Sequence, residues 1–98
     1  MELVIKYNQN RSQVEAIYIG PTNDRTTYIL DLPTTTPRNK AIEILVNHKF
    51  DGKYPLCENA IIYIFEKMYG KLSDKEILEL RGTITSIRLK ETVDYFNW

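Results

Sequence analysis

The chain has 98 residues, of which 43% are apolar and 27% charged, and thirteen basic residues balance thirteen acidic ones. These values predict one globular domain over residues 1–98 and argue against an intrinsically disordered chain. The zero net charge argues against a protein that binds nucleic acid mainly through its phosphates. One cysteine excludes an intrachain disulfide, and we expect a cytoplasmic protein with neither a secretion signal nor a membrane span.

Three β-strands are predicted in the N-terminal part of the chain. Apolar and polar side chains alternate along residues 2–7 and 13–20, and residues 26–32 are rich in β-branched and aromatic types. Turn-forming residues fill the intervals 8–12 and 20–24. Short turns between consecutive strands predict an antiparallel meander with one packed face and one exposed face.

Helical patterns follow the strands. Thr36 is a predicted N-cap, and Pro37 suits the first helical position, where its missing N–H costs nothing. A second helix is predicted over residues 57–69, with Cys57 on its packed face. Gly70 is the expected stop of that helix.

The third helix is predicted to be short. Ser73 and Glu76 have the spacing of a capping box, and Gly82 is the expected end. Residues 83–90 are compatible with a strand or with a longer helix, and their β-branched content favours a strand that returns to the sheet.

The predicted fold class is therefore α+β. It consists of a three- to four-stranded antiparallel sheet, beginning with the N-terminal meander and packed on one face by two or three helices, in the order βββαααβ. The predicted core includes Ile5, Ile17, Ile29, Leu45, Ile61, Ile64, Phe65 and Leu80.

Threonines and basic residues meet at the start of the first predicted helix, in the stretch LPTTTPRNK. The free N–H groups and partial positive charge of a helix N-terminus can hold a phosphate or a carboxylate. The alternative is an ordinary helix cap that needs no ligand, and the lack of glycine in the stretch favours it. The candidate anion-binding residues are Thr35, Thr36, Arg38 and Lys40.

Candidate catalytic residues are few. His48 is the single histidine and lies in or beside an apolar helix stripe, so we interpret it as a partly buried core residue. Cys57 is interpreted as a small buried hydrophobe. Metal-ligand spacings and glycine-rich nucleotide loops are absent from the sequence. The sequence predicts a non-enzymatic protein without a metal or cofactor.

Aromatic residues carry the clearest functional signal. The chain has seven tyrosines and ends in DYFNW, and Tyr and Trp are enriched at protein interfaces. Tyr18 and Tyr28 lie on neighbouring predicted strands, where a shared open face would form an aromatic platform. The predicted partner-binding residues are Tyr18, Tyr28, Tyr95 and Trp98.

Three classes of function remain open. The favoured class is a small protein that binds and modulates a protein partner, as phage- or virus-encoded inhibitors do. Residues with AT-rich codons are abundant, which fits such a source and the cytoplasm of a host cell. The second class is an oligomer, for example a homodimer, that sequesters a nucleotide or another phosphate ligand. The third is a nucleic-acid-binding regulator using the basic residues Arg38, Lys40, Lys49 and Lys53.

Overall fold

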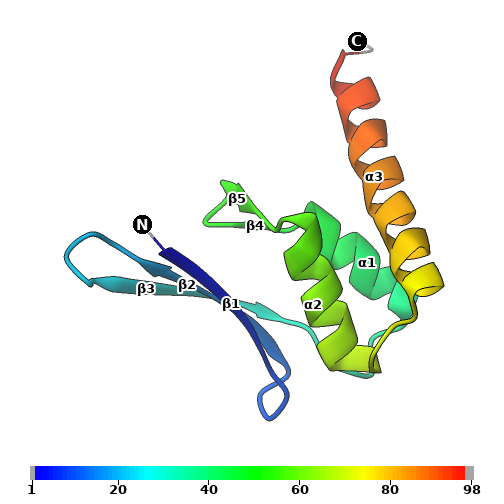
Figure 1. Ribbon diagram of the computed structural model, residues 1–98. Coiled ribbons are helices and arrows are strands. Elements are labelled where there is room, and N and C mark those ends of the chain that lie inside the picture. The colour runs from blue at the N-terminus through cyan, green and yellow to red at the C-terminus, as the bar shows by residue number, and fades with distance from the viewer. Residues whose placement is uncertain (1, 97–98) are drawn as a thin grey trace.

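The computed structural model describes residues 2–96, with side chains described through Lys90. A three-stranded antiparallel sheet in the order β1-β2-β3 occupies one side of the molecule, and the helices occupy the other (Figure 1). The predicted α+β class and the N-terminal meander are confirmed. The elements in chain order are β1 (Glu2–Asn8), β2 (Gln13–Ile19), β3 (Arg25–Asp31), α1 (Arg38–Asn47), β4 (Lys49–Phe50), β5 (Tyr54–Pro55), α2 (Glu58–Tyr69) and α3 (Asp74–Phe96).

One face of the sheet packs against the core. Tyr7, Val14 and Leu30 lie side by side on this face, because Val14 pairs with Tyr7 of β1 and with Leu30 of β3. Val14 is fully buried, and the Tyr7 hydroxyl donates a hydrogen bond of 2.6 Å to the Leu32 carbonyl. This bond satisfies the one polar atom that the tyrosine brings into the core. Of the three helices, α2 makes the principal contact with the sheet, through β1.

Two residues predicted for the core lie on the other face of the sheet. Ile5 pairs with Ala16, so their side chains share the packed face of the sheet. The side chains of Ile17 and Ile29 lie on the opposite face. Ile29 is 52% exposed, and Ile17 is only partly buried. The prediction was wrong for these two because β2, which holds Ile17, and β3, which holds Ile29, both carry apolar residues on both faces. The small Ala16, fully buried, is on the packed side.

The helices pack on one another around a shared apolar core. α1 contacts both α2 and α3, and α2 contacts α3. Leu45, Ile61 and Ile64 are fully buried, and Phe65 and Leu80 nearly so. These five predicted core residues are confirmed.

α3 is longer than predicted. It runs without interruption through Gly82, and the strand predicted at 83–90 is helical. The reason is tertiary burial, since Leu80 and Ile84 are 5% and 1% exposed and lie one helical turn apart on the side facing the core. Burying Ile84 outweighs the β-propensity of its β-branched neighbours. The predicted short helix and final strand are therefore corrected to one helix.

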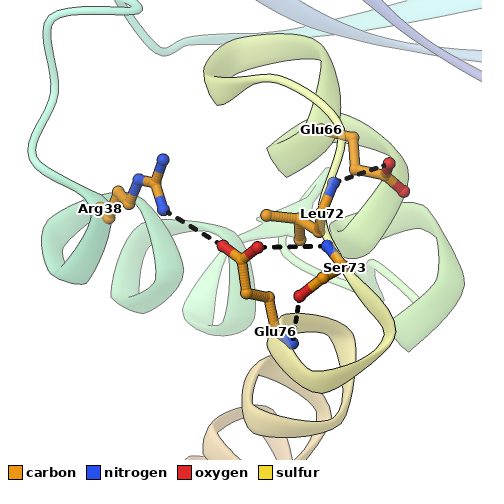
Figure 2. A network of polar contacts seen from close by, with 5 residues as sticks. All are labelled: Arg38, Glu66, Leu72, Ser73 and Glu76. Atoms are coloured by element: carbon orange, nitrogen blue, oxygen red, sulfur yellow. Dashed lines mark hydrogen bonds and ion pairs between the residues drawn. The ribbon is translucent and has the colours of Figure 1, made fainter.

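The helix signals near the α2–α3 connection are confirmed. Gly70 ends α2 with a φ of 100° and donates its N–H to the Glu66 carbonyl at 2.9 Å. At the start of α3, the Ser73 N–H donates to the Glu76 carboxylate and the Glu76 N–H donates to the Ser73 hydroxyl, both at 3.2 Å (Figure 2). This reciprocal pair is a complete capping box.

Candidate partner-binding site

The structure brings three tyrosines together on the packed face of the sheet. Tyr18 and Tyr28 lie diagonally across β2 and β3, with ring centroids 5.5 Å apart and an interplanar angle of 78°. Tyr54, from β5, lies 5.1 Å from Tyr18 with an angle of 42°. We call these three residues the tyrosine cluster. The sequence indicated that Tyr18 and Tyr28 share a face of the sheet, and they do, but that face is the packed one and not the open face that the aromatic platform requires. Tyr54 was missed because its two-residue strand has no periodic pattern.

The tyrosine cluster borders a hollow of about 170 Å³ beside the 20–24 turn. This turn lies at the end of the sheet farthest from the helices (Figure 1). Tyr54 is 40% exposed, and Leu3, the cross-strand neighbour of Tyr18, is 51% exposed. The apolar surface beside the hollow is therefore accessible at Tyr54 and extends onto β1 through Leu3. The residues lining the hollow are Tyr18, Gly20, Asp24, Thr26, Tyr28 and Tyr54.

The 20–24 turn holds a carboxylate at the rim of the hollow. The Gly20 N–H donates to the Asp24 carbonyl at 2.9 Å, and the Thr22 hydroxyl donates to Asp24 Oδ1 at 2.6 Å. A Cβ atom on Gly20 would lie 2.5 Å from Asp24 Oδ1, so this position requires glycine unless the carboxylate moves. The hydrogen bond from Thr22 is the main reason why the pKa of Asp24 is lowered, and the carboxylate is ionised at neutral pH.

A second carboxylate approaches the tyrosine cluster from the β4–β5 turn. Burial raises the pKa of Tyr28, and the charge of Asp51 and a hydrogen bond with it raise that pKa further. Burial also raises the pKa of Tyr18, with smaller contributions from Tyr54 and Tyr28. The raised pKa values keep Tyr18 and Tyr28 uncharged at neutral pH, and Asp24 borders the same hollow as these two residues. The site is both aromatic and acidic.

The predicted anion-binding residues are arranged differently. α1 begins at Arg38 with Pro37 at the cap position and no side-chain cap bond, so the prediction of Thr36 as the cap was wrong. Thr36 instead donates its N–H to the Pro33 carbonyl at 2.9 Å and accepts a hydrogen bond from the Tyr69 hydroxyl through its own carbonyl. The first turn of α1 is thereby fixed by backbone contacts and by α2.

Arg38 contacts side chains of its own protein, although its side chain is 55% exposed. Its guanidinium lies 5.3 Å from the Tyr69 ring centroid and 5.9 Å from that of Phe65, and 3.8 Å from the Glu76 carboxylate (Figure 2). The adjacent hollow of about 190 Å³ is lined by Glu76 and by a second carboxylate, Glu79, which repel an anion. This geometry favours the interpretation of the stretch as a helix start. Thr35 and Lys40 are exposed on the surface nearby.

Cys57 and His48 occupy separate structural positions. Cys57 precedes the first turn of α2 and is exposed, so the prediction that it lies on the packed face was wrong. The His48 ring is partly buried, 4.6 Å from the Phe50 ring centroid, and burial lowers its pKa. No hydrogen bond links the two in the described part of the chain, where clusters of three or more metal-ligating side chains are also absent.

Two predicted partner-binding residues cannot be placed in this site. Trp98 lies outside the described residues 2–96. The backbone of Tyr95 belongs to α3, and its side chain lies outside the described part.

Comparison with known proteins gives no relative: no protein-family model, curated protein or solved structure matches this chain. Among the helices of residues 2–96, none has the length and hydropathy needed to cross a membrane.

Proposed function

We propose that this protein works by binding a protein partner through the tyrosine cluster, without catalysis, and that it thereby modulates the partner as an inhibitor does. The observation that supports this proposal is the convergence of Tyr18, Tyr28 and Tyr54 from three strands around an accessible hollow. Tyr54 is 40% exposed, and Tyr18 and Tyr28 are partly exposed. Clustered tyrosines of this kind give a large contact area at a small entropic cost, which is typical of residues that dominate binding energy. The proposed compartment is the cytoplasm, that of a host cell if the gene is viral.

The chemistry of the hollow indicates what the partner presents. Asp24 lies on its rim and Asp51 contacts Tyr28, while the basic residues of the β4–β5 hairpin, Lys49 and Lys53, do not line it. Aromatic rings attract cations through their faces, and neighbouring carboxylates add to that attraction. The proposed contact is therefore an arginine or lysine side chain of the partner inserted among the tyrosine rings.

Titration with a short arginine-containing peptide tests the site directly. A matched peptide carrying citrulline, which keeps the shape but lacks the charge, is the control. We expect amide chemical-shift changes at the residues lining the hollow with the arginine peptide, and much smaller changes with the citrulline peptide. Equal changes with both peptides, or changes centred elsewhere on the protein, would contradict the proposal.

Paired capture from cell lysate tests the biological role. Wild type is compared with Tyr54→Ala, and Tyr63→Ala serves as the control because Tyr63 is a partly exposed tyrosine on α2 that does not line this hollow. Tyr63 lines instead the hollow between the β1–β2 turn and α2. Circular dichroism establishes that both variants fold. We expect one stoichiometric protein to be lost with Tyr54→Ala and retained with Tyr63→Ala. A partner retained by both variants would place the interface elsewhere.

A phosphate-bearing ligand is the alternative, and the structure offers one location for it. A hollow of about 420 Å³ between the β1–β2 turn and α2 is lined by Lys6, Asn8, Gln9 and Lys67, among others. Two ammonium groups and several amides suit an anionic ligand better than the α1 start does. Thermal stabilisation by nucleotides that disappears in Lys67→Ala would favour this alternative. Salt-sensitive binding to DNA or RNA would favour the nucleic-acid class instead.

A further inference from the structure

The two edges of the sheet differ in their protection. β1 carries Lys6 within the strand and packs against α2. β3 has an uncharged run from Thr26 to Leu30, rich in β-branched and aromatic residues and without lysine or proline. Natural proteins place lysine or proline on exposed edge strands, because an unprotected edge pairs with other strands. The β3 edge lacks this protection, and Ile29 at its centre is 52% exposed.

The hydrogen-bonding direction of β3 follows from a contact at its end. The Leu32 N–H donates to the Ser12 carbonyl at 2.8 Å, one step beyond the Gln13–Asp31 pair. In an antiparallel ladder, residues alternate between those bonded to the neighbouring strand and those whose N–H and C=O point away from it. The even-numbered residues of β3 are thus bonded to β2. The outward-pointing residues are Arg25, Thr27, Ile29 and Asp31.

We propose that two copies of this chain associate through antiparallel pairing of their β3 strands, about a two-fold axis at Tyr28, to form one continuous six-stranded sheet. In this register Arg25 lies opposite Asp31 of the second copy, and Thr27 lies opposite Ile29. Each of these pairs joins two outward-pointing residues, so the unsatisfied N–H and C=O groups of the edge bond to one another. The two-fold symmetry repeats every contact.

Charge selects this register over its neighbours. Among residues 2–90, whose side chains the structure describes, the Arg25 guanidinium forms no ion pair or hydrogen bond, and Asp31 accepts one hydrogen bond, from the Gln13 amide at 3.1 Å. Pairing about Tyr28 forms the Arg25–Asp31 ion pair twice. Pairing about Ile29 would place Arg25 opposite Pro33, and pairing about Thr27 would place it opposite Ile29, so both alternatives leave the charges unmatched. The association uses the strand edge and does not depend on partner binding at the tyrosine cluster.

Disulfide cross-linking tests the register. Cysteine replaces Thr27, Tyr28 or Ile29, one at a time, in a Cys57→Ser background that removes the exposed native thiol. A chain with one cysteine forms a disulfide-linked dimer only if that residue lies opposite the same residue of the second chain, at the two-fold axis. We expect the dimer band under oxidising conditions for Tyr28→Cys alone, with folding of each variant established by circular dichroism. Efficient cross-linking of Thr27→Cys or Ile29→Cys instead would overturn the proposed register.

Charge reversal tests the energetics without touching the tyrosine cluster. Arg25→Asp places like charges opposite each other and should weaken dimerisation at least about tenfold. Adding Asp31→Arg to the same chain restores opposite charges at both pairs, and dimerisation should recover. Arg11→Asp, an exposed arginine in the β1–β2 turn, is the matched control. Sedimentation equilibrium measures all four proteins.

Two outcomes would overturn the proposal. One is a wild-type protein that is monomeric at about 100 µM, a concentration at which even a weak specific dimer is populated. The other is a dimer that Arg25→Asp leaves unchanged, or that the double reversal fails to restore. Tyr54→Ala should leave dimerisation intact while it abolishes partner capture. Failure of one proposal is therefore distinguishable from failure of the other.

Discussion

Replacing Gly82 by alanine tests whether α3 is continuous. Gly82 lies in the interior of the helix with a helical backbone, and a Cβ atom added to it would meet nothing within 4 Å. Glycine inside a helix costs about 0.5–1 kcal/mol relative to alanine, because it loses more backbone entropy on folding. The free energy of unfolding should therefore rise by about 0.5–1 kcal/mol. For a domain of this size that corresponds to a melting temperature higher by roughly 2–8 °C.

Gly70→Ala is the control, and it should lower the free energy of unfolding where Gly82→Ala raises it. Gly70 has φ 100° and ψ 169°, a region populated almost only by glycine. Alanine there should lower the free energy of unfolding by about 1–3 kcal/mol. Thermal and urea unfolding, followed by circular dichroism at 222 nm, measure both variants. A lower melting temperature for Gly82→Ala would refute the continuous helix and support a helix that ends at Gly82.

Three further predictions concern the folded state. Ser73→Ala removes the hydroxyl that accepts from the Glu76 N–H and should cost about 1 kcal/mol in urea unfolding; an unchanged midpoint would contradict the capping box. Ile84→Ala should cost about 2–5 kcal/mol, whereas Leu89→Ala, at a residue 60% exposed, should change stability by less than about 0.5 kcal/mol; equal effects would contradict the described face of α3. Burial lowers the pKa of His48 below its ordinary 6.5, so the unfolded state binds more protons and stability should fall as the pH drops below that value. His48→Gln should remove this pH dependence of stability above pH 5. The carboxyl groups of Asp24 and Glu76 contribute only below that pH, because their pKa values are lowered from ordinary values of 3.8 and 4.5.

Local sequence signals predicted the sheet and most helix boundaries. The turns at 8–12 and 20–24 separate three strands correctly because turn chemistry depends on neighbouring residues alone. The capping box of Ser73 and Glu76 and the stop at Gly70 are likewise local, and all are confirmed. The alternation along neighbouring strands also indicated that Tyr18 and Tyr28 share a face, as their ring contact shows, but it did not indicate that this is the packed face.

Features that depend on tertiary packing were not predicted. β2 is apolar on both faces, so its alternation could not show that Ala16, and not Ile17, faces the core. The burial of Ile84 is a property of the assembled helices, and it overrides a local preference for a strand. Tyr54 reaches the tyrosine cluster only because the β4–β5 hairpin folds over the sheet, and its two-residue strands leave no detectable pattern.

The separation of sheet and helices along the chain has a consequence for synthesis on the ribosome. The meander is translated first, but the helix that covers its apolar face, α2, is translated after β3, α1 and the β4–β5 hairpin. A small sheet without its packing partner is at best marginally stable. During that interval the nascent chain exposes Val14 and Ala16 together with the open β3 edge, so chaperone demand and aggregation during expression should concentrate in that stage. Slowing elongation after the meander has emerged from the ribosome, but before α2 has emerged, should increase aggregation, whereas slowing it before the meander emerges should have little effect.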